Sequence, residues 1–275
     1  MKKLVILFSL ISVTLNAQNS ETRKTGDFNK IKSVNGGHIV YHFSTTPKVV
    51  IEAAEAADLK KVETRTEGKT LVIKTPKTEK NTQLKNFEVH VYGNTLQKID
   101  IGSGTVFKIQ DEIQLTSFSI EQQGYSEVNM GPGLHVTDLK VDIQSHAILK
   151  GNLISENIAG SIRTYSIWES NIKTGHMRLD IQKSSIVSLE GSARQISLSV
   201  TGSSIANTLK LTTSAAELIS EGSSVVESWV TGSLRAKAEN TSQILIKGEP
   251  DLAGITTRNM GLIANKNGKT YSNTF

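Results

Sequence analysis

The sequence predicts an all-β protein built as a parallel β-helix (β-solenoid) with coils of about 19–20 residues. Three observations lead to this fold class. Ser, Thr, Val, Ile and Gly are plentiful, whereas only 4 of the 275 residues are proline. Apolar and polar residues alternate in LKVDI (139–143), MRLDI (177–181) and ISLSV (196–200), as in strands that bury one face. This alternating pattern also recurs at a short and nearly constant interval along the chain.

The repeat is anchored on an aliphatic residue that follows each cluster of small polar residues. The anchors are Val106, Val128, Ile148, Ile167, Ile186, Ile205, Val225 and Leu245, at nearly even intervals along the chain. Positions nine, seven and five before an anchor are apolar in most repeats, as in Met177, Leu179 and Ile181 before Ile186. Stacked coils would bury these positions against their neighbours and pair their strands in parallel. An antiparallel sandwich is the competing fold, but its strand spacing would vary more with loop length.

Residues 1–17 have the layout of a signal peptide. Lys2 and Lys3 precede an apolar run, and the small residue Ala17 lies at a suitable cleavage position before Gln18. The apolar run is too short to span a bilayer, and no later stretch is apolar enough to form a membrane helix. We therefore expect an exported protein, located in the periplasm, at the outer surface or outside the cell.

The region 18–95 is rich in strand-forming residues but less regular than the rest of the chain. Strands are expected at 36–43, 48–53, 69–75 and 87–93. A short helical turn is expected within 52–61, and a polar, lysine-rich loop at 74–86. This region would form either wider coils of the solenoid or a small capping sheet, because an open solenoid end exposes unpaired strand edges.

Residues 96–275 are assigned to the repetitive solenoid. Its recognisable repeats span roughly 96–250, with one further turn expected on 254–263. Ser166, Ser185, Ser204 and Ser224 each lie one residue before an anchor. If the alignment is right, these serines stack into a ladder along one corner, about 4.8 Å apart per coil. Glycines such as Gly202 would relieve the backbone of that corner.

Several stretches resemble a known family. FNKIKSVNGGHIVYHF, GKTLVIKT and FEVHVYGNTLQKIDIGSGTVF resemble the opening of the head GIN domain family of autotransporter-type adhesins, from exported proteins of Bacteroidetes-type bacteria. The turns in IGSGTV, VTGSSI and SEGSSV are similar to the family's Ser-Gly-Ser turns. The resemblance covers roughly residues 27–270 and implies a right-handed β-helix, export and an adhesin function without established catalytic residues. The chain departs from the family pattern at Gly93, where members often have proline, and in its last residues, NKNGKTYSNTF.

Composition argues against several classes of function. The chain has no cysteine, which excludes disulfides and zinc-thiolate sites. Its formal charge of +5 comes from interspersed charges of both signs, which are typical of a solvated surface and not of a nucleic-acid-binding track. Neither a G-x-S-x-G nucleophile motif nor a Walker loop is present. We therefore expect no catalytic residues, no metal site and no cofactor.

Two sets of polar residues are candidates for chemistry. His38 and His42 would lie about 13 Å apart on a strand, too far for one metal ion. Asp100, Asp142 and Asp180 each lie six residues before an anchor and would form one outward column, as carboxylates do in glycan-cleaving β-helices. However, each aspartate has a basic residue two positions earlier, and surface ion pairs explain the column better.

Aromatic residues in or near the turns are candidates for stacking against sugars. The candidate ligand-facing residues are Tyr165, Trp168 and Trp229, and Tyr125 has a similar position. The favoured function is an exported, non-catalytic binding or adhesion module at the cell envelope, whose partner is a surface ligand such as a glycan or a protein. Formation of homo-oligomers is compatible with this reading. The alternatives are a structural, self-assembling solenoid and a glycan-cleaving β-helix.

Overall fold

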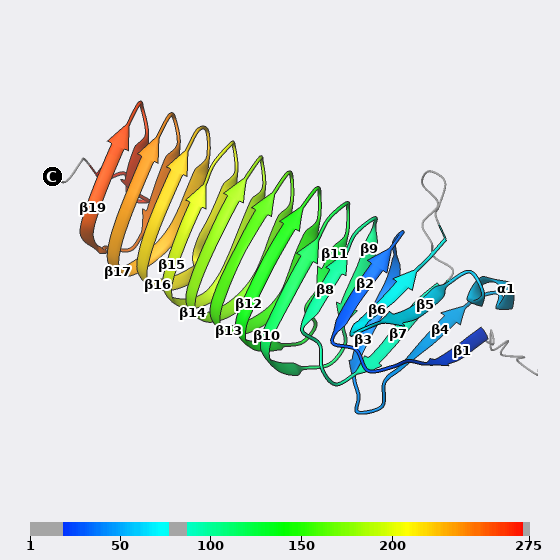
Figure 1. The fold of residues 1–275 in the computed structure, drawn as a ribbon. Coiled ribbons are helices and arrows are strands. Elements are labelled where there is room, and N and C mark those ends of the chain that lie inside the picture. Colours follow the sequence, from blue (N-terminus) through cyan, green and yellow to red (C-terminus); the bar gives the residue numbers. More distant parts are fainter. Residues whose placement is uncertain (1–18, 77–86, 272–275) are drawn as a thin grey trace, which may run out of the picture.

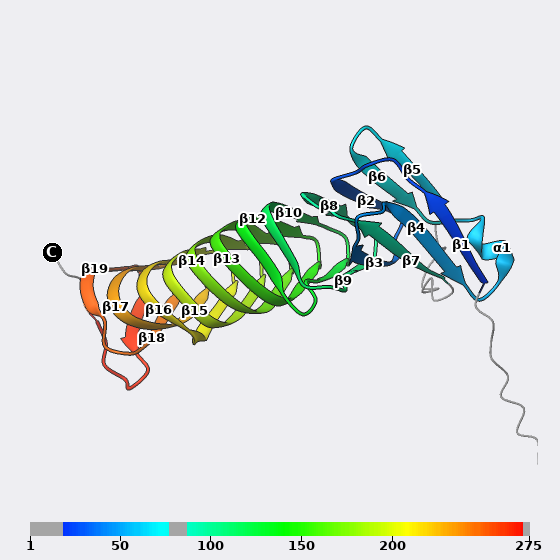
Figure 2. The ribbon, with the colours of Figure 1, turned by 90° about the horizontal axis from the view of Figure 1, so that it is seen from below.

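The computed structural model describes residues 19–76 and 87–271, and these residues are mostly in β-strands. The strands wind into a β-solenoid of about nine turns (Figure 1), which is the fold that the sequence predicts. Viewed along a perpendicular direction, the coils follow one another along a single axis, with the N-terminal strands grouped at one end (Figure 2). The expected signal peptide and most of the expected polar loop lie outside the described residues.

The N-terminal region contains seven strands and one short helix. The strands are β1 (Asn19–Lys24), β2 (Lys30–Val34), β3 (Gly37–Phe43), β4 (Lys48–Ala53), β5 (Glu63–Glu67), β6 (Thr70–Lys74) and β7 (Phe87–Gly93). Helix α1 is the single turn Ala56–Leu59. All four strands expected in this region are therefore confirmed, as is the helical turn within 52–61.

This region combines solenoid coils with an antiparallel cap. Strands β2 and β3 pair in parallel with β8 (Lys98–Ile101) and β9 (Thr105–Ile109) on one side, and with β6 and β7 on the other. The coil that comes first in the chain is thus second in space. Beyond it, β5 pairs antiparallel with β6, and β4 pairs antiparallel with both β7 and β1. The last strand on one side, β5, exposes Glu63, Arg65 and Glu67, and charged edge strands of this kind resist pairing with other chains.

The remaining strands form the regular stack. They are β10 (Ile113–Gln122), β11 (Glu127–Asn129), β12 (Leu134–Gln144), β13 (Ile148–Arg163), β14 (Ile167–Gln182), β15 (Ile186–Val200), β16 (Ile205–Glu221), β17 (Val225–Glu239), β18 (Gln243–Lys247), β19 (Asp251–Arg258) and β20 (Leu262–Asn265). Each pairs in parallel with the corresponding strand of the next coil. The further turn expected on 254–263 corresponds to β19 and β20, which pair with β17 and β18.

The register confirms the repeat in the middle of the chain and corrects it at both ends. Ile148, Ile167, Ile186 and Ile205 pair in succession, at one constant interval. At the start of the array, Glu127 and not Val128 pairs with Val106 and Ile148, because the coils there are longer than the central ones. At the end, Gln243 and not Leu245 pairs with Val225, because that coil is shorter. Both predicted anchors were therefore wrong, by one and two positions.

Alternation along each strand separates the core from the surface. The positions nine, seven and five before an anchor point inward, as predicted, and Met177, Leu179 and Ile181 are all 2% exposed or less. They belong to a single apolar core that runs through the stack. The anchors that keep the register face outward, and Ile186 and Ile205 are 39% and 40% exposed, whereas the misaligned anchor Val128 is buried. The residue after each such anchor is therefore the one that enters the core.

The predicted serine ladder is present at one corner, and all four serines are fully buried. The Ser166 backbone N–H donates to Ser185 Oγ at 3.3 Å, and the Ser185 N–H donates to Ser204 Oγ at 3.2 Å. Ser185 Oγ in turn donates to the Gln182 carbonyl at 2.8 Å. These small side chains thus satisfy polar groups that the corner would otherwise leave buried and unpaired.

The two residues before Ser166, and those before Ser204, form the tip of a turn and adopt positive φ. Gly202 has φ 62°, as expected from the need to relieve the backbone, but Thr164 and Tyr165 have φ 58° and 60°. Backbone bonds stack these tips on one another, since the Tyr165 N–H donates to the Lys183 carbonyl at 3.0 Å. A row of turn tips therefore forms a ridge along the solenoid, on which large side chains are held away from the core.

Candidate functional site

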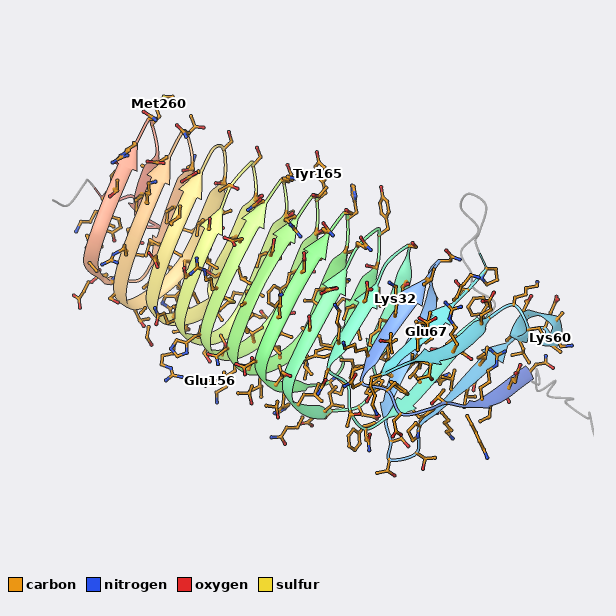
Figure 3. The ribbon with its side chains drawn as sticks, in the orientation of Figure 1. Lys32, Lys60, Glu67, Glu156, Tyr165 and Met260 are labelled. Carbon is orange, nitrogen blue, oxygen red and sulfur yellow. The ribbon has the colours of Figure 1, made fainter. Side chains whose placement is uncertain are left out.

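The structure places the three candidate ligand-facing aromatics in three different environments. Tyr165 lies on the turn ridge and is 58% exposed (Figure 3). Trp168 is fully buried, and its Nε1–H donates to Ser170 Oγ at 2.8 Å. Because it follows the outward anchor Ile167, Trp168 points into the core, and its assignment as ligand-facing was wrong. Trp229 is half-buried, and Lys247 Nζ lies 3.6 Å from its ring centroid. This cation covers one face of the ring.

Tyr165 belongs to a stack of three rings on the ridge, formed by Tyr125, His146 and Tyr165 and here called the Tyr–His stack. The Tyr125 and His146 ring centroids lie 4.6 Å apart with 14° between the ring planes. Those of His146 and Tyr165 lie 5.3 Å apart with 21° between the planes. Tyr125 is 73% exposed. The sequence pointed to Tyr125 and Tyr165 individually, but the part played by His146 depends on the register of three coils.

The Tyr–His stack ends abruptly at both sides. The residue at the same turn position before Tyr125 is Gly104, and the one after Tyr165 is Ser184. Neither residue can continue a stack of rings. One face of Tyr165 is therefore directed along the ridge toward a small side chain.

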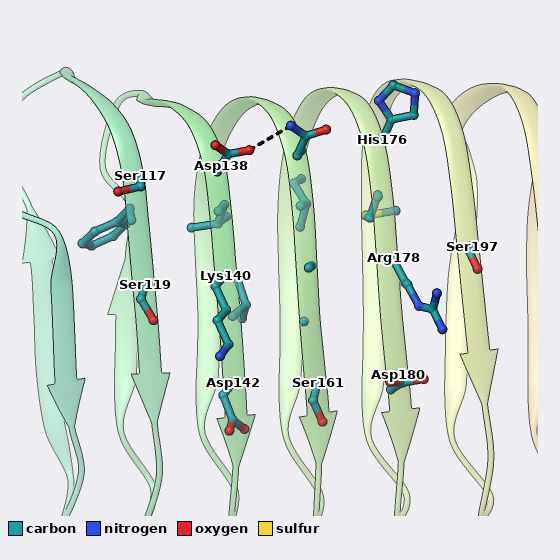
Figure 4. Close-up of a pocket in the computed structure, with 18 of the residues that line it drawn as sticks. Ser117, Ser119, Asp138, Lys140, Asp142, Ser161, His176, Arg178, Asp180 and Ser197 are labelled. Carbon is teal, nitrogen blue, oxygen red and sulfur yellow. Dashed lines mark hydrogen bonds between the residues drawn. The ribbon is translucent and has the colours of Figure 1, made fainter.

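A second surface feature is a shallow depression of about 820 Å³ on the outer face of β10 to β15 (Figure 4). Its centre is the outward side of β13, where Ala159 and Ser161 form a floor of small side chains. Their neighbours in register are Lys140 and Asp142 on β12, and Arg178 and Asp180 on β14. The longer side chains of the flanking strands thus form walls around the floor. We call this feature, defined by these six residues, the β13 groove.

The two cations of the β13 groove are free to meet a ligand. Within residues 19–76 and 87–271, neither Lys140 nor Arg178 has an ion-pair partner, and both are exposed. Asp142, in contrast, accepts a hydrogen bond from Arg163 at 2.7 Å. At the end of the groove, Asn157 Nδ2 donates to Asp138 Oδ1 at 2.8 Å (Figure 4). The groove therefore combines fixed acceptors with two cations that have no competing partner.

The predicted aspartate column exists, but its ion pairs differ from those expected. Asp100, Glu121, Asp142, Ser161 and Asp180 follow one another across the coils. Asp100 pairs with Lys32 at 3.3 Å and Asp142 with Arg163 at 2.7 Å, both on neighbouring strands or coils. Of the expected partners, two residues earlier on the same strand, Lys98 pairs with Glu121 on the neighbouring strand instead, and Lys140 and Arg178 make no ion pair within the described residues.

The aspartates of the groove stand on either side of β13. Two strand spacings separate the Asp142 and Asp180 backbones, or about 9.6 Å. That is wider than the roughly 5–5.5 Å between the carboxyl groups of a retaining glycosidase and close to the upper end of the roughly 6.5–9.5 Å of an inverting one. Asp142 is also engaged by Arg163, so the column offers a ligand hydrogen-bond acceptors more readily than a nucleophile and acid pair.

A histidine pair in the N-terminal region was not foreseen. His42 Nε2 lies 3.0 Å from His90 Nδ1, within hydrogen-bond distance, although the two are far apart in the chain. Parallel pairing of β3 with β7 brings them together. Burial lowers the pKa of His42, and the neighbouring His90 lowers it further, whereas Asp111 and Glu88 act in the opposite direction. Among the residues that the structure describes, no group of three or more His, Asp or Glu is arranged to hold a metal ion.

In the described part of the chain, no helix has the length and apolarity needed to cross a membrane. The family model described as "Putative auto-transporter adhesin, head GIN domain" matches residues 27–164 and 144–250. No curated protein matches the sequence.

Three solved structures are similar in fold. A "putative adhesin" from Parabacteroides merdae ATCC 43184 has a TM-score of 0.66 at 15% identity, covering 90% of this chain and 95% of that one. A "putative adhesin" from Parabacteroides distasonis ATCC 8503 has a TM-score of 0.65 at 15% identity, covering 90% and 96%. A "putative lipid binding protein" from the same strain has a TM-score of 0.59 at 18% identity, again covering 90% and 96%.

Proposed function

Because the chain belongs to the head GIN domain family of auto-transporter adhesins, we propose that it is an adhesion module that binds an extended surface ligand in the β13 groove. Binding would be non-covalent and would need no cofactor. A solenoid suits this role, since stacked coils present a long, repetitive face to an extended partner. The family supplies the class of function, and the groove supplies the place on this chain.

The observation that carries the proposal is the pair of unpaired cations across a floor of small residues. Lys140 and Arg178 stand on opposite walls of the groove, with Ala159 between them in register. A ligand lying on the floor would contact both cations and the hydroxyl of Ser161 without displacing an internal ion pair. Arginine can offer two parallel donors to one acceptor group, which gives such a contact direction as well as attraction.

Adhesion to a surface ligand also requires export. The Lys2–Lys3 start, the apolar run and Ala17 support a signal peptide, and an adhesin-like family agrees with a surface or secreted location. We therefore place the mature protein at the cell envelope or outside the cell.

The test is a binding measurement on the mature protein with Lys140 and Arg178 both replaced by alanine. Wild-type protein, labelled at its N-terminus, is applied to an array of bacterial, host and plant polysaccharides and to whole bacterial cells. We expect the double variant to bind at least about tenfold more weakly, because each lost charged hydrogen bond contributes roughly 1.5–3 kcal/mol before solvent screening. Lys173→Ala is the matched control, since Lys173 is also exposed on β14 but lies outside the groove.

Unchanged binding by the double variant would place the site elsewhere. Release of new reducing ends from any polysaccharide by the wild type, lost in Asp142→Asn or Asp180→Asn, would contradict a purely non-covalent role. Concentration-dependent assembly without ligand binding would favour the structural alternative, and light scattering on the same samples measures it.

A further inference from the structure

The Tyr–His stack points to the chemical class of the ligand. We propose that the free face of Tyr165, together with the hydroxyl groups of Ser184 and Ser203, forms a stacking subsite for the rings of a saccharide chain. This inference deepens the proposed adhesion function and rests on it for its biological meaning. It is carried by the turn ridge and not by the groove, so the two can fail independently.

The first argument is the unfavourable backbone conformation of the three aromatic residues at the turn position. Tyr125, His146 and Tyr165 have φ 56°, 66° and 60°, in a left-handed region that is unfavourable for bulky side chains. The same turn position carries Gly104, Ser184 and Ser203 in neighbouring coils. The fold therefore does not need aromatic rings at this position, and three adjacent rings at the most exposed point of the coil call for a different explanation.

The second argument is the accessibility of one ring face. In the Tyr–His stack, His146 covers the inner face of each tyrosine. Over the other face of Tyr165 there is neither a ring nor a cation within the described part of the chain. Tyr92 and Trp229 differ in this respect, since Lys48 and Lys247 lie over their rings. Tyr165 thus offers an apolar surface whose orientation is fixed by the ring behind it.

The third argument is the kind of molecule that would use this surface. A sugar ring has a C–H face that packs on an aromatic ring and hydroxyl groups around its edge. Beyond Tyr165, Ser184 and Ser203 lie at the turn position of the next two coils, at intervals of about 4.8 Å. Their hydroxyls can both donate and accept, as can those of a sugar. An aromatic side chain of a protein partner would stack on Tyr165 but would leave these hydroxyls without a role.

The subsite is also continuous with the β13 groove. The floor residues Ala159 and Ser161 lie on β13, and the same strand ends at Arg163, two residues before Tyr165. A chain that lies along the groove in the strand direction therefore reaches the ridge at Tyr165. The groove would contact the polar groups of the chain, and Tyr165 would hold one of its rings.

The experiment compares the wild type with Tyr165→Ala and Ser184→Tyr on immobilised neutral and acidic polysaccharides, namely a β-glucan, an α-mannan, a pectin and a heparin. Tyr165→Ala removes the ring, and Ser184→Tyr fills the open face with a further ring. We expect both to weaken binding to the polysaccharide that the wild type prefers by about tenfold, the size of one lost aromatic contact at a binding site. Met260→Ala, at the same turn position in the last coil and 82% exposed, is the control and should retain binding. Circular dichroism and thermal melting establish that all variants are folded.

The outcomes separate the two proposals. Loss of binding in both Tyr165→Ala and Ser184→Tyr, with Met260→Ala unaffected, supports the subsite. Wild-type binding in either variant overturns it, even if the Lys140 and Arg178 double variant has lost binding and the adhesion function stands. A wild type that binds cells through a protein and none of the polysaccharides overturns the saccharide assignment while keeping the adhesion module.

Discussion

At the scale of single residues, the buried serines of the corner link neighbouring turns, a role that disulfides have in many exported proteins. The chain has no cysteine, so its turns are held by packing and hydrogen bonds alone. Ser185 illustrates the arrangement, since its hydroxyl donates to the carbonyl of Gln182 and accepts from the N–H of Ser166 in the preceding coil. One small side chain therefore joins its own turn to the turn of its neighbour.

Replacement of Ser185 by alanine should destabilise the protein by about 1–2 kcal/mol, because it leaves a buried N–H and a buried carbonyl with fewer partners. The free energy of unfolding in urea measures this change. Ser188→Ala is the control, since Ser188 is exposed on β15, three residues after Ser185, and its replacement should have an effect near zero. Equal stability of Ser185→Ala and the wild type would show that water or a shifted backbone replaces the hydroxyl.

Residue-level prediction succeeded where the phase of alternation was known. Met177, Leu179 and Ile181 could be placed in the core because they precede the turn in an unbroken strand. Trp168 could not be placed in the core from the sequence. The turn residues Thr164 and Tyr165, with positive φ, and the buried Ser166 lie between the preceding strand and the strand that contains Trp168. These turn residues interrupt the alternation of inward and outward side chains. Which residues of the strand after the corner point inward is therefore known only from the pairing of the strands in three dimensions.

At the scale of strands, the N-terminal region differs most from a simple repeat. The coil formed by β2 and β3 lies between the β6–β7 coil and the β8–β9 coil. Individual strands were predictable from their β-branched residues, but their order was not. Nothing in local periodicity distinguishes a strand that pairs with its sequence neighbour from one that pairs far along the chain, as Ile39 does with Val89 and Phe107.

The pairing of β3 with β7 should make stability depend on pH through His42. Its pKa is lowered in the folded state, first by burial and then by His90, with a smaller effect of Lys108 and opposing effects of Asp111 and Glu88. The unfolded chain therefore takes up a proton at His42 before the folded chain does. This contribution to stability is fully present above the ordinary histidine pKa of about 6.5 and is lost as pH falls below it, toward the folded pKa.

Urea unfolding between about pH 7.5 and pH 5 measures the effect, which one proton limits to about 1.4 kcal/mol per pH unit. In His42→Gln the decline over this range should be smaller. His38→Gln is the control, because His38 is exposed on β3, four residues before His42, and should keep the wild-type decline. A His42→Gln profile parallel to that of the wild type would contradict the assignment.

At the scale of the whole molecule, the central coils are interchangeable units. Ile148, Ile167 and Ile186 occupy the same place in three successive coils of equal length. Deletion of residues 167–185 would therefore remove one complete coil and allow β13 to pair with β15 in the same register. Such near-neighbour architecture makes stability an approximate sum over coils and their interfaces.

We expect this deletion variant to fold, with a strand-type circular dichroism spectrum and a single thermal transition below that of the wild type. Deletion of residues 167–184 is the matched control, since it removes one residue fewer. The one-residue shift would turn the inward residues of the following strand outward, and we expect the control to be unfolded or aggregated. Folding of both variants to the same extent would mean that the register is not set by the alternating pattern.

The candidate site became visible only at this scale. The sequence predicted the column that contains Asp142 and Asp180, because equal spacing from the anchors is enough to align residues across coils. The groove itself depends on a contrast between three strands, with the small residues Ala159 and Ser161 on β13 between longer side chains on β12 and β14. Such a contrast has no signature within any one repeat, since each repeat read separately shows an ordinary polar face.

The order of the coils also has a mechanical consequence. The two ends of the molecule lie at opposite ends of the solenoid axis, and the backbone ladder joins each central coil to the coils on either side of it (Figure 1). Tension applied at the C-terminal end would load the ladder bonds of the outermost coil first, so coils would peel away one after another. Each central coil would release roughly 65 Å of extended chain. The interleaved N-terminal coils, held together by strands far apart in sequence, would have to rupture together. A domain of this construction would lengthen in small steps under a pulling force while its N-terminal end stayed intact.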